Sequence, residues 1–155
     1  MLKVGQMAPL DIDVFDMDEN ITTLRQFLGK KIILYFYPKD STPGCTKEAC
    51  DFRDSNSNIE KLGAKIIGVS ADSVDSHTKF LKKYKLQFEL LSDSDHKLSK
   101  AFGVWGKKSA FGKIGLGMTR ATFILDEGGK IIKVWPKVNV DGHTGEIIQF
   151  LSEND

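Results

Sequence analysis

The feature that most constrains the fold is the apolar run Ile32–Phe36, the most hydrophobic stretch of the sequence. A strand with apolar side chains on both faces has to be covered on both sides, as the strands of parallel sheets are. The run leads into residues 37–44, which are rich in Pro, Ser, Thr and Gly, and then into a helical pattern. Active sites of α/β proteins are commonly built where a buried strand passes through such a loop into a helix. We therefore expect Lys31–Phe36 to be a central strand with a functional loop after it.

The other elements follow from hydrophobic periodicity and from turn residues. Strands are expected at residues 10–14, 21–23, 65–70, 88–91, 122–125 and 131–135, and helical segments at 24–28, 43–62, 73–84, 94–102 and 145–151. Residues 103–117 contain five glycines and are expected to form an irregular surface loop. This order predicts an α/β protein with a central mixed, mostly parallel sheet, helices on both faces and an N-terminal β-hairpin. The order is compatible with a thioredoxin-like fold without singling it out.

Length and charge narrow the class of protein. The 155 residues carry no repeat and no linker, so residues 1–155 are expected to form one domain. Lys and Arg number 22 against 21 Asp and Glu, which leaves no basic excess for a nucleic acid backbone. No apolar run approaches the roughly 20 residues that span a bilayer, and the start lacks the apolar segment of a signal peptide. We expect a cytoplasmic protein that binds neither nucleic acid nor membrane.

Cys45 occupies a special position in the predicted helix. Thr42 is a good N-cap and Pro43 suits the first helical position, so Cys45 falls within the first turn. The helix dipole and the free N–H groups stabilise an anion there, which favours the thiolate. The thiolate is the nucleophilic form of cysteine. A reactive Cys45 is therefore expected in preference to a small buried apolar residue.

Cys50 lies five residues further along the same predicted helix. On an ideal helix the two Cα atoms would be about 8.7 Å apart and their side chains would point about 140° apart around the axis. A disulfide needs Cα atoms within about 7 Å. Two alternatives follow: Cys50 is a bystander, or the first turns of the helix unwind when Cys45 is oxidised.

The spacing of the two cysteines argues against two other kinds of site. A disulfide oxidoreductase would usually carry Cys-x-x-Cys, which is absent. A structural zinc site needs about four ligands, and His77, His96 and His143 are scattered along the chain. We expect no metal, and we expect all three histidines to be solvated surface residues.

The segment Tyr37–Cys50, YPKDSTPGCTKEAC, resembles the active-site motif of the peroxiredoxins. Within that family it is similar to the bacterioferritin comigratory protein (BCP/PrxQ) subfamily, whose hallmark is a second cysteine five residues after the first. The resemblance extends over nearly the whole chain and includes residues 68–73, 91–93 and 120–126. It implies a thioredoxin-like fold and a thiol peroxidase that uses neither metal nor haem.

The resemblance also implies roles for the two cysteines. Cys45 is the peroxidatic cysteine, which attacks the peroxide O–O bond and becomes a sulfenic acid. Cys50 is the resolving cysteine, which condenses with the sulfenic acid to an intramolecular disulfide. Thioredoxin or a similar dithiol then reduces that disulfide. A resolving cysteine in the same chain removes the need for a partner chain, so a monomer is expected.

Five further residues match the family's site. Arg120 corresponds to the catalytic arginine, whose fixed fork of donors can hold both thiolate and peroxide oxygen; otherwise it would be a surface cation. Thr42 offers a hydroxyl and Gly44 a backbone N–H to the leaving oxygen, and Pro38 would shield the thiolate. Glu48 matches an acidic residue that orients the site, although a solvated first-turn glutamate is nearly as well supported.

Three functions are compatible with these residues. The leading one is a thioredoxin-dependent peroxidase for hydrogen peroxide and small alkyl hydroperoxides, with a role in antioxidant defence. The second is a redox sensor or adaptor that uses the same disulfide to alter binding. The third is a thioredoxin-like module without enzymatic activity. Consumption of peroxide that depends on Cys45 distinguishes the first from the other two.

Overall fold

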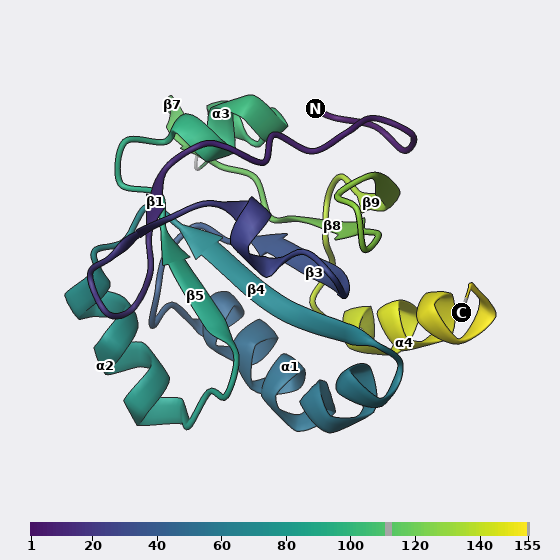
Figure 1. Cartoon of the computed structure of the whole chain (residues 1–155). Helices are drawn as coiled ribbons and strands as arrows, with labels where there is room; N and C mark the ends of the chain where they lie inside the picture. The colour runs from purple at the N-terminus through teal and green to yellow at the C-terminus, as the bar shows by residue number, and fades with distance from the viewer. Residues whose placement is uncertain (111–112, 155) are drawn as a thin grey trace.

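The structure is a computed structural model that describes residues 1–110 and 113–154. Its main sheet has seven strands in the order β2-β1-β5-β4-β3-β8-β9 (Figure 1). The strands are β1 (Val14–Phe15), β2 (Ile21–Thr22), β3 (Lys31–Phe36), β4 (Ala64–Ser70), β5 (Glu89–Ser92), β8 (Ala121–Leu125) and β9 (Ile131–Trp135). Strand β3 lies between β4 and β8, and all its residues after Lys31 are buried. The expected central strand is thus confirmed.

The sheet is mixed as expected, with its parallel part in the middle. Four of the six strand pairings in the main sheet of the described residues are antiparallel, so it is less parallel than the sequence suggests. Strand β3 pairs parallel with β4, and β4 pairs parallel with β5. Strand β8 runs antiparallel to both β3 and β9, and β1 runs antiparallel to both β2 and β5. The β8–β9 hairpin and the N-terminal β1–β2 hairpin are therefore present, and they flank a parallel core of three strands.

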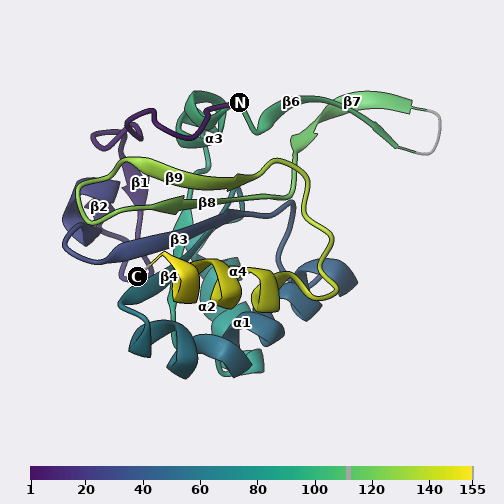
Figure 2. The ribbon, with the colours of Figure 1, turned by 90° about the vertical axis from the view of Figure 1, so that its right-hand side faces the viewer.

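Helices cover both faces of the sheet, as the double-sided burial of β3 requires. Helices α1 (Pro43–Lys61), α2 (Val74–Tyr84) and α4 (His143–Glu153) lie on one face, and α3 (Lys97–Phe102) lies on the other (Figure 2). The short 3-10 helix η1 (Leu24–Phe27) also contributes Leu24 to the core on the α3 face. Strand β3 divides its side chains accordingly: Ile33 and Tyr35 join the core under α1, while Leu34 and Phe36 join the other.

Residues 105–110 and 113–118 pair as the two strands of a hairpin, so the expected irregular loop is wrong for these residues. Strands β6 (Trp105–Ala110) and β7 (Lys113–Met118) pair antiparallel and project from the body (Figure 2). The base of the hairpin is anchored, because the Trp105 ring stacks on His96 at 3.7 Å between centroids and Met118 is buried. Paired glycines such as Gly106 and Gly117 hide the alternation that identifies strands. Residues 111–112 of the expected loop lie outside the described residues.

Two histidines are buried, which corrects the expectation that all three are solvated. His77 in α2 and His143 at the start of α4 are 1% and 2% exposed. His143 Nε2 lies 2.8 Å from Thr122 Oγ1, and burial lowers the pKa of this histidine despite the opposing influence of Glu146. His96 is half-buried under Trp105. Each imidazole thus has a specific environment rather than bulk solvent.

Helix α3 begins at Lys97, three residues later than the sequence suggests. The Asp93 carboxylate accepts hydrogen bonds from the N–H groups of Leu98 and Ser99, at 3.1 and 2.8 Å. His96 has φ 63°, in the left-handed region, so the residues after Asp93 turn before they become helical. An acidic side chain that satisfies the first-turn donors explains why the helix starts there.

No helix among residues 1–110 and 113–154 is long and apolar enough to cross a membrane.

Candidate active site

Cys45 lies in the first turn of α1, which follows the loop after β3. Thr42 is the N-cap residue and Pro43 opens the helix, as the sequence predicts. The first helical hydrogen bond runs from the Thr46 N–H to the Thr42 carbonyl at 2.8 Å. The N–H groups of Gly44 and Cys45 therefore have no acceptor within the helix and can serve an anion. The thiol itself is 1% exposed.

The Thr42 side chain does not cap the helix. Its hydroxyl donates to the Lys39 carbonyl at 2.9 Å instead, although the Thr42 backbone has the extended conformation of an N-cap. The hydroxyl hydrogen is thus used in a bond to the loop that precedes the helix, and the oxygen keeps lone pairs that can accept a hydrogen bond. Thr42 consequently links the helix start to the loop, and its oxygen remains available as an acceptor.

Arg120 reaches the site from the start of β8, the strand that pairs with β3 on the side opposite β4. It directly precedes β8, which pairs with β3, and its Nη2 donates to Cys45 Sγ at 3.2 Å. Its Nη1 donates to Glu48 Oε1 at 2.7 Å. The planar fork of the guanidinium thus holds a sulfur and a carboxylate at once, and it places a permanent positive charge within hydrogen-bond distance of the sulfur. The structure brings together residues that are 75 positions apart in the sequence.

Glu48 is buried beside the thiol, which excludes the alternative of a solvated first-turn glutamate. Its side chain is 2% exposed, and among the described residues Oε2 has no hydrogen-bond partner. Burial raises the pKa of Glu48 from its ordinary 4.5 to about 7, against the opposing effect of Arg120, which favours the carboxylate. Glu48 therefore changes its charge near neutral pH at a place where it fixes the orientation of Arg120.

The raised pKa of Glu48 predicts a specific dependence of stability on pH. Between pH 4.5 and about 7, Glu48 is protonated more often in the folded state than in the unfolded state. The stabilisation that this proton gives is therefore complete below pH 4.5 and is lost as the pH rises toward about 7. The contribution of Glu48 to the free energy of unfolding should fall by up to about 3 kcal/mol over this window. Urea unfolding should show that the free energy of unfolding changes less between pH 5 and pH 7.5 in Glu48→Gln than in wild type. The glutamine keeps an acceptor for Arg120. Equal differences for both proteins would contradict the assignment.

Gly44 allows Arg120 to approach the helix. A Cβ built on Gly44 would lie 3.2 Å from Arg120 Nη2, the atom that donates to Cys45 Sγ. Gly44→Ala should slow the reaction of Cys45 with peroxide by about tenfold because the guanidinium is displaced. The free energy of unfolding should stay level or rise by up to about 1 kcal/mol, since alanine is the better helix former. Stopped-flow kinetics and urea unfolding check the two effects separately; an unchanged peroxide rate would show that the contact is unimportant.

Cys50 lies on the same intact helix and is half-buried. Both cysteines are free thiols in this structure. Because α1 is wound from Pro43 through Lys61, the Cα atoms are separated by about the 8.7 Å of an ideal helix, beyond disulfide range. The two thiols can pair only if the first turns of α1 unwind.

Pro38 follows β3 in the loop that leads to α1 and is partly buried. The same loop contains Asp40, which the sequence analysis did not single out. Asp40 is buried, and its Oδ2 lies 2.6 Å from Nδ1 of His77 in α2. No pattern in the sequence marks this pair, because the two residues are 37 positions apart and meet only after β4 and α2 have packed.

Asp40, Asp72 and His77 form the one group of possible metal ligands found among the described residues, with ligand atoms within 4.8 Å of one another. Hydrogen bonds already occupy these atoms. Asp72 Oδ2 accepts from the Asp40 N–H and from Ser70 Oγ, at 2.8 and 2.7 Å. The direct contact of 2.6 Å between Asp40 and His77 leaves no gap for an ion. This group is better described as a buried hydrogen-bonded cluster than as a metal centre.

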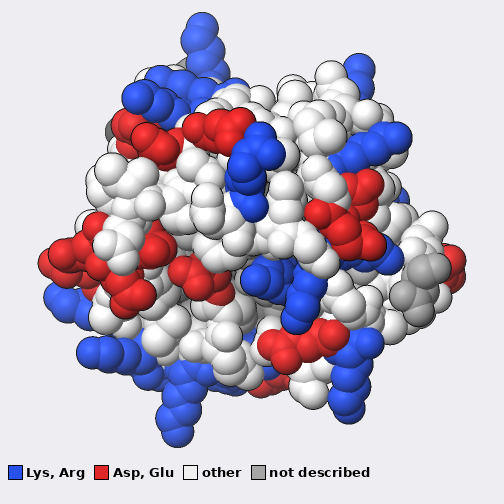
Figure 3. Space-filling model, viewed as in Figure 1, with Lys and Arg blue, Asp and Glu red and all other residues white. Residues whose placement is uncertain are grey.

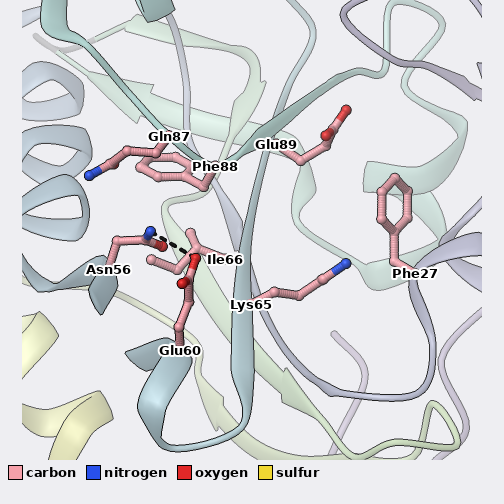
Figure 4. Close-up of a pocket in the computed structure, with 8 residues that line it drawn as sticks. All are labelled: Phe27, Asn56, Glu60, Lys65, Ile66, Gln87, Phe88 and Glu89. Carbon is pink, nitrogen blue, oxygen red and sulfur yellow. Dashed lines mark hydrogen bonds between the residues drawn. The ribbon is translucent and has the colours of Figure 1, made fainter. Parts of the chain in front are cut away.

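Apart from the site around Cys45, the surface carries a pocket and a mixture of charged side chains. A pocket at the C-terminal half of α1 is lined by Phe27, Asn56, Glu60, Lys65, Ile66, Gln87, Phe88 and Glu89 (Figure 4). Its polar groups are partly satisfied by each other: Asn56 donates to Glu60 at 3.0 Å, and Lys65 lies over the Phe27 ring. On the face shown in Figure 3, acidic and basic side chains of the described residues are interspersed.

The fold and the site together define a class of protein. A cysteine in the first turn of a helix, held by an arginine from a neighbouring strand of a mixed sheet, is the arrangement of thiol-dependent peroxidases with a thioredoxin-like fold. The chain belongs to the AhpC/TSA family, whose sequence profile matches residues 4–134. Within that family it is a peroxiredoxin of the BCP/PrxQ type, and thus an oxidoreductase.

Similar proteins support this placement over the whole chain. Peroxiredoxin Bcp of Bacillus subtilis is 49% identical over 152 residues, covering 98% of this chain and 96% of the relative. Peroxiredoxin Bcp of Escherichia coli K12 is 39% identical, covering 99% and 97%. A structure of the Xanthomonas campestris bacterioferritin comigratory protein, solved in a study of its alkyl peroxide reduction, superposes with a TM-score of 0.89. That protein is 41% identical, and the match covers 96% of both chains. The thioredoxin-like fold of the peroxiredoxins is thereby confirmed.

Proposed function

We propose that the chain reduces hydrogen peroxide and small alkyl hydroperoxides through Cys45. The Cys45 thiolate attacks one oxygen of the O–O bond, and the second oxygen leaves as hydroxide or alkoxide and takes up a proton. Cys45 becomes a sulfenic acid, and the product is water or an alcohol. The contact of 3.2 Å between Arg120 Nη2 and Cys45 Sγ is the observation that carries this proposal.

The surroundings of Cys45 fit the charge that develops during this step. Negative charge moves from sulfur to the leaving oxygen, so the site needs donors for both atoms. Arg120 and the free N–H groups of Gly44 and Cys45 can supply them, and Thr42 Oγ1 can accept the hydroperoxide hydrogen. Glu48 holds Arg120 in place, and Pro38 limits the access of water. The contact of Arg120 with Glu48 supports the role of Glu48, and the resemblance of the motif supports the role of Pro38.

We assign Cys50 as the resolving cysteine. Its thiol condenses with the Cys45 sulfenic acid, which forms the S–S bond and releases water. A dithiol such as thioredoxin then returns both cysteines to thiols and is itself oxidised to a disulfide. The separation of the thiols on α1 means that each cycle includes unwinding and rewinding of the first helical turns.

The same scheme suggests how the protein is organised in the cell. Resolution within one chain works in a monomer, with residues 1–155 as a single domain. No cofactor enters the cycle, because the electrons come from the dithiol. A reducing compartment such as the cytoplasm suits an enzyme whose disulfide must be reopened in every cycle, and antioxidant defence is the role that fits this chemistry.

Replacing Cys50 by serine tests the scheme. Cys50→Ser should still consume about one equivalent of peroxide per chain and then accumulate the Cys45 sulfenic acid, because no second thiol can displace water from it. Turnover supported by thioredoxin, its reductase and NADPH should be strongly reduced in the same variant. Stopped-flow measurement of the first turnover and mass spectrometry after dimedone labelling check both results. Undiminished turnover with thioredoxin would contradict the role of Cys50.

A redox sensor is the second candidate, since a disulfide that unwinds a helix also changes the surface. If each chain reduces many equivalents of peroxide in the presence of thioredoxin, the protein acts as an enzyme. A single oxidation that persists in the presence of thioredoxin favours the sensor.

A further inference from the structure

Asp40 is held on all sides by residues outside the active site. Its Oδ1 accepts from the Tyr37 hydroxyl at 2.6 Å, and its Oδ2 accepts from Ser76 Oγ at 2.8 Å and contacts His77 Nδ1 at 2.6 Å. The side chains of Asp40 and His77 are 2% and 1% exposed. We call this contact the Asp40–His77 clamp.

Both ring nitrogens of His77 have a polar partner. His77 Nε2 lies 3.0 Å from the carbonyl oxygen of Leu91, which can only accept, so Nε2 carries a hydrogen. The other ring nitrogen, Nδ1, lies 2.6 Å from Asp40 Oδ2. His77 thus bridges the carboxylate in the loop and the backbone of β5, and it does so without contact to either thiol.

The clamp does not depend on the helix that carries the cysteines. Its partners Tyr37, Ser76, His77 and Leu91 belong to the end of β3, to α2 and to β5. The Asp40 N–H is also fixed, because it donates to Asp72 Oδ2 at 2.8 Å. Unwinding of residues 41–50 would therefore break none of these bonds.

A second group of contacts fixes α1 just after Cys50. The Phe52 ring is 0% exposed and stacks on Tyr35 at 4.6 Å between centroids. Arg53 Nη1 donates to the Tyr84 carbonyl at 2.8 Å, and Gln87 donates to the Arg53 carbonyl at 3.2 Å. Between Asp40 and Phe52, the polar contacts join Arg120 to Cys45 and Glu48 and Lys47 to Asp51 and Asp141. Cys45 and Ala49 are also buried in the core, so unwinding of this segment must expose them.

We propose that His77 is a positioning residue for the peroxidase cycle, and that the clamp sets the N-terminal limit of the segment that unwinds. This inference rests on the Cys45–Cys50 chemistry proposed above. With Asp40 held, rearrangement is confined to residues 41–51, and the loop returns Cys45 to Arg120 after each reduction. Without the clamp the loop before α1 gains freedom, Cys45 is no longer held against Arg120, and the first reaction slows.

The test compares reduced and oxidised protein by amide hydrogen exchange and by stopped-flow kinetics. The variants are Asp40→Ala, His77→Leu and the double variant, with Asp40→Asn as a conservative replacement that can donate to a neutral His77 Nδ1. Phe80→Leu is the matched control, because Phe80 is equally buried in α2 and its side chain carries no group that can hydrogen-bond to Asp40; it reaches the clamp only through its ring contact with Tyr37. It loses packing of α2 without touching Asp40.

In oxidised wild type, exchange should increase for residues 41–51 and stay slow for residue 40 and residues 53–56. In His77→Leu the increase should spread to residues 37–40, and the peroxide step should slow by about tenfold or more. The double variant should be no slower than the single ones, Asp40→Asn should recover most of the rate, and Phe80→Leu should change it by less than about twofold. Should His77→Leu fail to fold, Asp40→Ala and Ser76→Ala provide the same comparison.

Equal exchange boundaries and equal peroxide rates for the clamp variants and Phe80→Leu would overturn the inference. Its failure can be told apart from failure of the proposed function. If oxidised wild type contains no Cys45–Cys50 disulfide, the proposed function is wrong; if the disulfide forms and its unwound segment ignores His77, only this inference is wrong.

Discussion

Cys45→Ser is expected to reduce peroxide consumption to the level of the buffer alone. A serine hydroxyl stays protonated at neutral pH and is a far weaker nucleophile than a thiolate, so neither Arg120 nor the helix dipole can activate it. The substitution is nearly isosteric, and the buried position keeps a polar atom within reach of Arg120 Nη2. Stopped-flow mixing with hydrogen peroxide and with cumene hydroperoxide measures the loss directly.

Two controls show that the loss belongs to the thiol of Cys45. Thermal unfolding of Cys45→Ser should occur within a few degrees of the wild type, which excludes a folding defect. Cys50→Ser should retain its single rapid reaction under the same conditions, which excludes a general effect of removing a thiol. A Cys45→Ser protein that still consumed peroxide at the wild-type rate would show that the reactive group lies elsewhere.

Arg120→Ala is expected to slow the peroxide step by about 10²–10³-fold. The guanidinium is the cation in hydrogen-bond contact with Sγ, and loss of one preorganised donor at a site of developing charge commonly costs this much. Alkylation of Cys45 by iodoacetamide at fixed pH should slow as well, because the sulfur loses the cation that contacts it. The rate of the peroxide step in Arg120→Lys should lie between the rates of wild type and Arg120→Ala, since lysine keeps the charge but cannot bridge Sγ and Glu48 at once.

The variant needs a control for Glu48, which loses its ion-pair partner in Arg120→Ala. Making the same change in a Glu48→Gln background removes the unpaired carboxylate, so a rate loss that persists there belongs to Arg120. Arg25→Ala is the matched surface control, because Arg25 forms an exposed pair with Asp11 far from the site in sequence. An Arg120→Ala enzyme with the rate of Arg25→Ala would contradict the proposed contact.

The sequence predicts the position of Cys45 in the first turn of a helix because the signals for that position are local. The apolar run that becomes β3, the N-cap Thr42 and the proline at the first helical position all lie within a few residues of Cys45. Helix geometry alone showed that Cys50 cannot reach Cys45 on a wound α1, which the intact helix and the two free thiols bear out. Short-range rules were sufficient for these features.

Features that depend on tertiary contacts were missed or came only from the resemblance. The partnership of Glu48 with Arg120 depends on β8 pairing beside β3, and without the family motif Arg120 would have been taken for a surface cation. His77 gave no signal, since its burial against Asp40 follows from the packing of α2 on the sheet. The β6–β7 hairpin was missed because its glycines mask the alternation of side chains.

The central claim is that oxidation joins two thiols that the folded helix keeps apart. The most direct test is mass spectrometry under non-reducing conditions after wild type has reacted with one equivalent of hydrogen peroxide. We predict a monomer whose mass is about 2 Da lower, with a peptide in which Cys45 and Cys50 are joined. Oxidised protein that is linked only between chains, or that carries a lasting Cys45 sulfenic or sulfinic acid beside a free Cys50, would contradict it.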